Sequence, residues 1–98
     1  MSLPVAYLPE AQDDIDAAYA QYEQRQAGLG DRFLDALRQA IERTADTPEL
    51  YGTVHQDVRA APIRRFPQVV YYRAEPTRVL IIAVQHGRRS SRGWQGRA

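Results

Sequence analysis

The sequence has 98 residues, of which 44% are hydrophobic, and this size is typical of one small domain with a single core. It contains no cysteine and only two histidines, which excludes a disulfide framework and a thiolate or His-rich metal site, so we expect no metal and no cofactor. No stretch is long and apolar enough to cross a membrane, and the N-terminus lacks a signal-peptide pattern. We therefore expect a cytoplasmic protein.

The charged residues divide the chain into two halves of opposite sign. Residues 1–57 contain four arginines and eleven acidic residues, a net charge of −7, whereas residues 58–98 contain nine arginines and one acid, a net charge of +8. A basic C-terminal half favours an anionic partner, either nucleic acid or an acidic protein segment. The alternative is that the two halves only neutralise each other across the fold.

The N-terminal half predicts a short strand at residues 3–8 and then a helical hairpin at about 9–47. Pro9 suits the first position of a helix over residues 9–27, and the acidic residues after it suit the positive end of the helix dipole. The apolar residues of this helix recur at helical spacing, at Ile15, Ala18, Tyr19 and Tyr22. Gly28 suits a left-handed break before a second helix over residues 31–47, and the short break predicts antiparallel helices.

The C-terminal half predicts three strands between about residues 58 and 87. The run 79–84 is apolar throughout and rich in β-branched residues, which favours a central strand covered on both faces. The runs 58–66 and 69–73 precede it with short turns, as in an antiparallel meander, and residues 88–98 form a basic tail. The predicted fold is α+β, one domain over residues 1–98 with the order β-α-α-β-β-β, in which a helical hairpin packs on an antiparallel sheet.

The end of the predicted central strand carries the strongest candidate for chemistry. Metal-free cleavage of RNA needs a base, an acid and cations that stabilise the charged phosphorane. His86 could act as base or acid, with Arg64, Arg65 or Arg88 as the cations. The alternative is structural. In a regular strand His86 lies on the same face as Leu80, Ile82 and Val84, and it would then lie at the edge of a core. Tyr71 and Tyr72 point to opposite faces, so at least one should pack inside.

The aromatic residues of the helices also allow two interpretations. Tyr19 and Tyr22 belong to the stripe that should face the sheet, and core packing explains them. The chain nevertheless carries more large apolar surface than a domain of this size easily buries, and a partly exposed aromatic stripe suits a partner peptide.

Taken together, several short motifs resemble those of the RelE/ParE toxin superfamily, and the ParE, or plasmid-stabilisation, branch most closely. In chain order they are Pro9-Glu10-Ala11, Asp14-Ile15, Gly28-Leu29-Gly30-Asp31-Arg32-Phe33, Val58-Arg59, Ile63-Arg64-Arg65-Phe66-Pro67, Val70-Tyr71-Tyr72-Arg73 and Ala83-Val84-Gln85-His86-Gly87-Arg88-Arg89, with Trp94 after them. The resemblance implies the toxin of a type II toxin–antitoxin pair. It also implies a ParD-like antitoxin whose C-terminal segment covers apolar and basic surface of the toxin.

The two branches imply different targets. ParE-branch toxins inhibit DNA gyrase and are not nucleases, whereas the RelE branch cuts mRNA in the ribosome with basic residues on the sheet. The chain has no lysine, which favours the non-enzymatic branch. A third possibility is a member that only binds its antitoxin.

These alternatives predict two sets of functional residues. The predicted antitoxin- or target-binding residues are Tyr19, Tyr22, Arg59, Arg65, Arg73, Arg88, Arg89 and Trp94. The residues that would serve the endoribonuclease alternative are Arg64, Arg65, Tyr72, His86 and Arg88.

Overall fold

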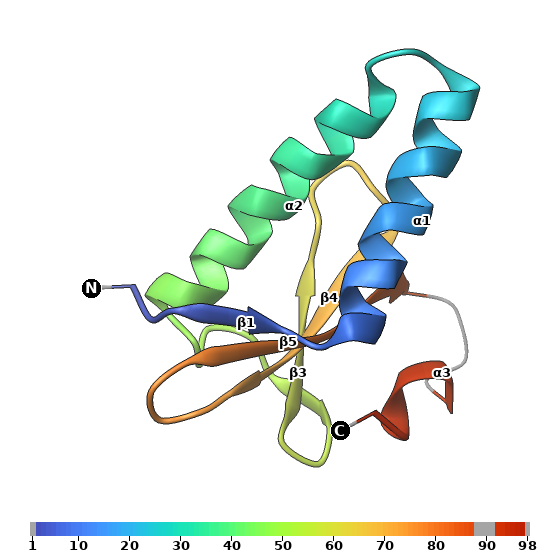
Figure 1. The fold of residues 1–98 in the computed structure, drawn as a ribbon. Helices are drawn as coiled ribbons and strands as arrows, with labels where there is room; N and C mark the ends of the chain where they lie inside the picture. The colour runs from blue at the N-terminus through green and yellow to red at the C-terminus, as the bar shows by residue number, and fades with distance from the viewer. Residues whose placement is uncertain (1, 88–91, 98) are drawn as a thin grey trace.

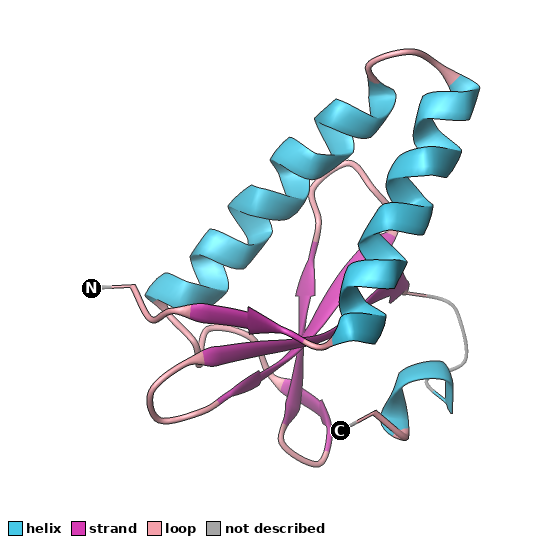
Figure 2. Cartoon of the chain, in the orientation of Figure 1, coloured by secondary structure: helices cyan, strands magenta, loops and turns pink. Residues whose placement is uncertain are grey.

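The computed structural model describes residues 2–87 and 92–97 (Figure 1). Its elements are β1 (Val5–Tyr7), α1 (Pro9–Arg25), α2 (Leu29–Asp46), β2 (Thr53–His55), β3 (Val58–Pro62), β4 (Gln68–Ala74), β5 (Val79–His86) and α3 (Arg92–Gln95). The five strands form one sheet in the order β1-β5-β4-β3-β2. The hairpin of α1 and α2 covers one face of this sheet, and the short helix α3 lies at the other face (Figures 1 and 2). This confirms the predicted α+β fold.

The helical hairpin begins and turns where the sequence predicted. Pro9 is the first residue of α1, and Leu8 before it gives no side-chain cap. Gly28 takes a left-handed backbone with φ of 86°, which a residue without Cβ adopts at no steric cost. The carboxylate of Glu23 in α1 accepts hydrogen bonds from the backbone N–H groups of Gly28 and Gly30, at 3.2 and 2.8 Å. An acid of the first helix therefore caps the second, which begins at Leu29 rather than at residue 31.

The sheet is mixed rather than antiparallel throughout as predicted, because β1 pairs in parallel with β5 while the other strands pair in antiparallel fashion. The strands differ from the sequence prediction in two main respects. Residues 53–55, which lie between the predicted hairpin and the predicted strands, form the edge strand β2, and β3 ends at Pro62 rather than at residue 66. The chain turns after Pro62 because the N–H of Phe66 donates to the carbonyl of Ile63 at 3.3 Å.

Strand β5 is covered on both faces, as its apolar run predicted. All six residues from Val79 to Val84 are buried. The core on the helical side includes a cluster of three aromatic rings, in which Phe66 lies edge-on to Tyr22 and Phe33 with centroids 5.2 and 5.4 Å away.

No helix among residues 2–87 and 92–97 is long and apolar enough to cross a bilayer.

A bulge in β5 corrects the predicted alternation of its side chains. Tyr71 of β4 pairs with Ala83, but Tyr72 pairs with Ile81, so Ile82 is an extra residue in β5. Such a bulge reverses the alternation of the residues that follow it. Val84 therefore lies in the core under the helices, whereas Ile82 lies in the opposite core, and the predicted shared face of the two residues is wrong.

Candidate functional site

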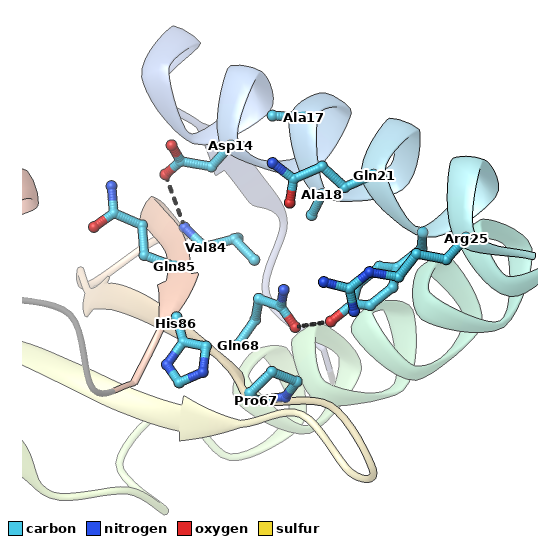
Figure 3. Close-up of a pocket in the computed structure, with 11 residues that line it drawn as sticks. Asp14, Ala17, Ala18, Gln21, Arg25, Pro67, Gln68, Val84, Gln85 and His86 are labelled. Atoms are coloured by element: carbon cyan, nitrogen blue, oxygen red, sulfur yellow. Dashed lines mark hydrogen bonds between the residues drawn. The ribbon is translucent and has the colours of Figure 1, made fainter.

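The bulge brings His86 to a polar hollow of about 570 Å³ between α1 and the sheet, here called the α1 hollow (Figure 3). It is lined by Asp14, Ala17, Ala18, Gln21, Tyr22, Arg25, Pro67, Gln68, Val84, Gln85 and His86. The hydroxyl of Tyr22 donates to Oε1 of Gln68 at 2.9 Å, and the guanidinium of Arg25 lies over the Tyr22 ring at 5.7 Å. The hollow thus combines amide groups, one carboxylate, one guanidinium and one imidazole, and these groups can bind polar ligands.

Asp14, which lines the α1 hollow, forms an ion pair with Arg97 near the C-terminus. Nη1 of Arg97 lies 2.7 Å from Oδ2 of Asp14 and also donates to the carbonyl of Ile82 at 3.2 Å. The same Oδ2 accepts the N–H of Val84 at 3.1 Å. The hydrogen bond to Asp14 raises the pKa of the Arg97 guanidinium. Two side chains thus satisfy the backbone of β5 beyond the point where β1 ends.

A second hollow of about 580 Å³ lies on the other side of the hairpin, between α2 and the turn that follows β3, and is here called the α2 groove. It is lined by Leu29, Arg32, Asp35, Ala36, Gln39, Arg64, Arg65 and Phe66. Three guanidinium groups therefore surround apolar surface from Leu29, Ala36 and Phe66.

The opposite face of the sheet is covered by the C-terminal residues that the structure describes. Trp94 of α3 is 2% exposed and stacks on Tyr71, with ring centroids 4.4 Å apart and planes at 22°. His55 of β2 meets the same indole edge-on at 6.0 Å. The predicted basic tail thus contains a helix that completes the second core.

The predicted binding residues lie in several places rather than in one surface. Tyr22 and Trp94 are buried and serve packing, and Tyr19 is partly exposed on α1. Asp31 and Glu23 raise the pKa of the Tyr19 phenol. The guanidinium of Arg59 donates to the carbonyl of Tyr51 at 2.6 Å, and Arg73 pairs with Asp57 at 3.0 Å. Arg65 lines the α2 groove. Arg88 and Arg89 lie outside the described residues.

The described residues of the endoribonuclease alternative line two hollows or lie in the core. His86 lines the α1 hollow, whereas Arg64 and Arg65 line the α2 groove, and the two hollows share no lining residue. Tyr72 is fully buried and donates to the carbonyl of Pro48 at 2.8 Å. Burial raises the pKa of its phenol, so the hydroxyl is held neutral.

Sequence reasoning missed the ion pair between Asp14 and Arg97. In the sequence, Asp14 belongs to the acidic start of the first helix and to one motif of the resemblance, and Arg97 belongs to the basic tail. Neither residue type signals this role, because the two are 83 positions apart and meet only through the fold. Only an indirect indication of such a contact exists. Strand β1 is shorter than β5, so part of the edge of β5 has no partner strand and needs other hydrogen-bond partners.

Comparisons with known proteins agree with this architecture. The model of the family described as the ParE toxin of the type II toxin–antitoxin system parDE matches residues 5–91. The structure is similar to one titled as the chromosomal ParDE system from P. aeruginosa, with a TM-score of 0.64 and 18% identity over 87% of this chain and 96% of that chain.

It is also similar to one titled as the toxin–antitoxin complex RelBE2 from Mycobacterium tuberculosis. The TM-score is 0.63, with 20% identity over 88% of this chain and 99% of that chain. A search of curated protein sequences finds no match. The family match spans both the helical hairpin and all five strands, and this chain belongs to the ParE toxin family of type II toxin–antitoxin systems.

Proposed function

We propose that this chain is a toxin that inhibits DNA gyrase in the cytoplasm and is neutralised by a ParD-like antitoxin. The observation that carries the proposal is the match to the ParE family over residues 5–91, because ParE-branch toxins act on gyrase. The structure of a ParDE system that this fold is similar to supports an antitoxin as the partner.

The engagement of Tyr72 in the core supports a non-enzymatic mode of action. General acid–base catalysis requires the base, the acid and the charge-stabilising groups within hydrogen-bond reach of one substrate. Here His86 and the Arg64–Arg65 pair line different hollows, and the hydroxyl of Tyr72 is engaged with a backbone carbonyl. An inhibitor needs only a binding surface, which does not require these groups to meet.

A gyrase supercoiling assay with the purified chain tests the proposal. We expect inhibition of supercoiling together with linear plasmid that appears after protein digestion, and reversal of both when the antitoxin is added. Unchanged supercoiling at every toxin concentration, with a protein that is folded and binds its antitoxin, would contradict gyrase as the target.

The α1 hollow favours one alternative, a ribosome-dependent endoribonuclease centred on His86. This hollow places the imidazole on the same surface as the Arg25 guanidinium and the side-chain amides of Gln21 and Gln68. If this alternative holds, mRNA is cut in a translating extract and His86→Ala abolishes the cleavage. His55→Ala is the matched control, because it removes the other histidine of the chain at the opposite face of the sheet.

A further inference from the structure

We propose that the α2 groove is a binding site for the carboxylates of an acidic, partly apolar peptide segment, with Arg65 as its central contact. The inference adds a site to the proposed function, because it names the surface and the side-chain chemistry by which a partner protein would bind. It depends on backbone geometry, charge and the composition of the groove.

The backbone of Arg65 gives the first argument. Arg65 is the third residue of the turn from Ile63 to Phe66, which is closed by a hydrogen bond of 3.3 Å between those two residues. Its φ is +70°, in the left-handed region that favours Gly or Asn at this position of a turn. An arginine there destabilises the turn. Strained residues of this kind are concentrated at binding sites, where the side chain is used.

The charge of the groove gives the second argument. Arg32 approaches the groove from α2, and Arg64 and Arg65 approach it from the turn. The ion pairs among the described residues involve none of these three arginines. The one acid of the groove, Asp35, is already paired with Arg38 at 3.3 Å. Three neighbouring cations repel one another, so an anionic ligand would relieve that repulsion. Each guanidinium can also bind a carboxylate through two parallel hydrogen bonds, and the groove therefore complements an anionic ligand.

The walls of the groove favour a peptide over a nucleic acid. Leu29, Ala36 and Phe66 supply apolar surface between the cations, which suits a segment that alternates carboxylate and aliphatic side chains. The ring of Phe66 packs edge-on against Tyr22 and Phe33, so the core holds it in place instead of leaving it as an open platform for a base.

Binding of a fluorescent peptide in which glutamate and leucine alternate tests the site. The variant Arg65→Asn removes the cation and keeps a residue that adopts the left-handed backbone readily, so the fold is preserved. We expect its affinity for the peptide to fall about tenfold, as for the loss of one charge-assisted hydrogen bond, with no decrease in its unfolding temperature. Arg78→Asn is the matched control. It removes the same charge from an exposed turn, where Arg78 pairs with Glu75, and should change the affinity less than about twofold.

Four outcomes would overturn the inference, three with the peptide and one with a nucleic acid. The wild-type chain would fail to bind the peptide, Arg65→Asn would bind it as tightly as the wild type, or Arg65→Asn and Arg78→Asn would lose affinity equally, as a pure effect of net charge. A thymidine oligonucleotide of the same charge serves as the competing ligand. If it binds more tightly than the peptide and loses affinity in Arg65→Asn, the groove is a nucleic-acid site instead. Gyrase inhibition is measured on the same wild-type preparation, so a failure of the proposed target is distinguished from a failure of the groove.

Discussion

Asp14 and Arg97, 83 positions apart in the sequence, form a bidentate ion pair that replaces a missing strand. Strand β1 pairs with β5 only as far as Ile81. Beyond that point, Oδ2 of Asp14 accepts the N–H of Val84 and Nη1 of Arg97 donates to the carbonyl of Ile82. An exposed strand edge is a site for unwanted pairing, and here two side chains of opposite charge protect it. The same pair connects the first helix to the C-terminal residues.

The variant Arg97→Ala should loosen the C-terminal residues before the rest of the fold. It leaves the carbonyl of Ile82 without a donor and the Asp14 carboxylate without its cation. Because the two side chains are only 15–17% exposed, we expect a loss of about 2–3 kcal/mol in the free energy of unfolding. Trp94 is the only tryptophan, so its fluorescence reports on this region. We expect its emission to shift to the red at lower urea than the loss of helical circular dichroism.

Arg78→Ala is the control for that experiment, since Arg78 forms an exposed pair with Glu75. Exposed pairs contribute little, so its unfolding free energy should change by less than about 0.5 kcal/mol. Coincident fluorescence and circular dichroism transitions in Arg97→Ala, at the wild-type midpoint, would show that the ion pair does not hold the C-terminal residues.

The sequence predicted the helices and strands well, but it did not predict on which side of the sheet the residues at the end of β5 lie. The apolar run from Val79 to Val84 indicated a strand buried on both faces, because only a covered strand can lack polar residues. Nothing in that run marks Ile82 as the extra residue of a bulge, since every residue in it is apolar. The side on which His86 lies depends on this one residue, so its position could not be derived from alternation alone.

The candidate sites show the same limit. Arg64 and Arg65, the candidate cations of the endoribonuclease alternative, are both exposed, as expected for two arginines beside a Pro-containing turn. Which hollow each of them lines follows only from the folded structure, in which Arg64 and Arg65 line the α2 groove and His86 lines the α1 hollow. Trp94 was expected on a partner surface, yet it completes the core on the far face of the sheet. An isolated tryptophan in a basic segment gives no indication of which ring it will stack against.

Gly30→Ala should destabilise the fold, although alanine is the better helix former by about 1 kcal/mol. A Cβ on Gly30 would lie 2.7 Å from Cγ of Glu23 and 2.8 Å from the ring of Tyr19. Displacement of Glu23 also breaks its hydrogen bonds to the first N–H groups of α2. We expect a net loss of about 1–2 kcal/mol, measured by urea denaturation. Gly52→Ala, where a Cβ meets nothing within 4 Å, should be close to neutral. Equal effects of the two substitutions would exclude a close helix contact at Gly30.

Arg65→Asn should stabilise the isolated chain. The left-handed backbone costs an ordinary residue roughly 1 kcal/mol, and asparagine adopts it more readily. Removal of one of three neighbouring cations acts in the same direction. We therefore expect the free energy of unfolding to rise by about 0.5–1 kcal/mol in urea, and the gain to shrink at high salt as the repulsion is screened. A decrease in stability would mean that the Arg65 side chain makes a contact that holds the turn.

The buried tyrosines predict a loss of stability at alkaline pH. Burial raises the pKa of Tyr71 and Tyr72, so the folded state favours their neutral phenols. The unfolded chain ionises first, above about pH 10, and then binds fewer protons than the folded chain. Stability is therefore fully present below that pH and falls as the pH rises, as urea midpoints measured across this range will show.

Tyr72→Phe separates this effect from general alkaline denaturation. It removes one ionisable group and the hydrogen bond to Pro48, so we expect it to be about 1 kcal/mol less stable than the wild type at neutral pH. The difference should narrow above about pH 10, because the variant has one fewer group that ionises on unfolding. A constant difference across the whole pH range would show that Tyr72 ionises equally readily in the folded and unfolded chain.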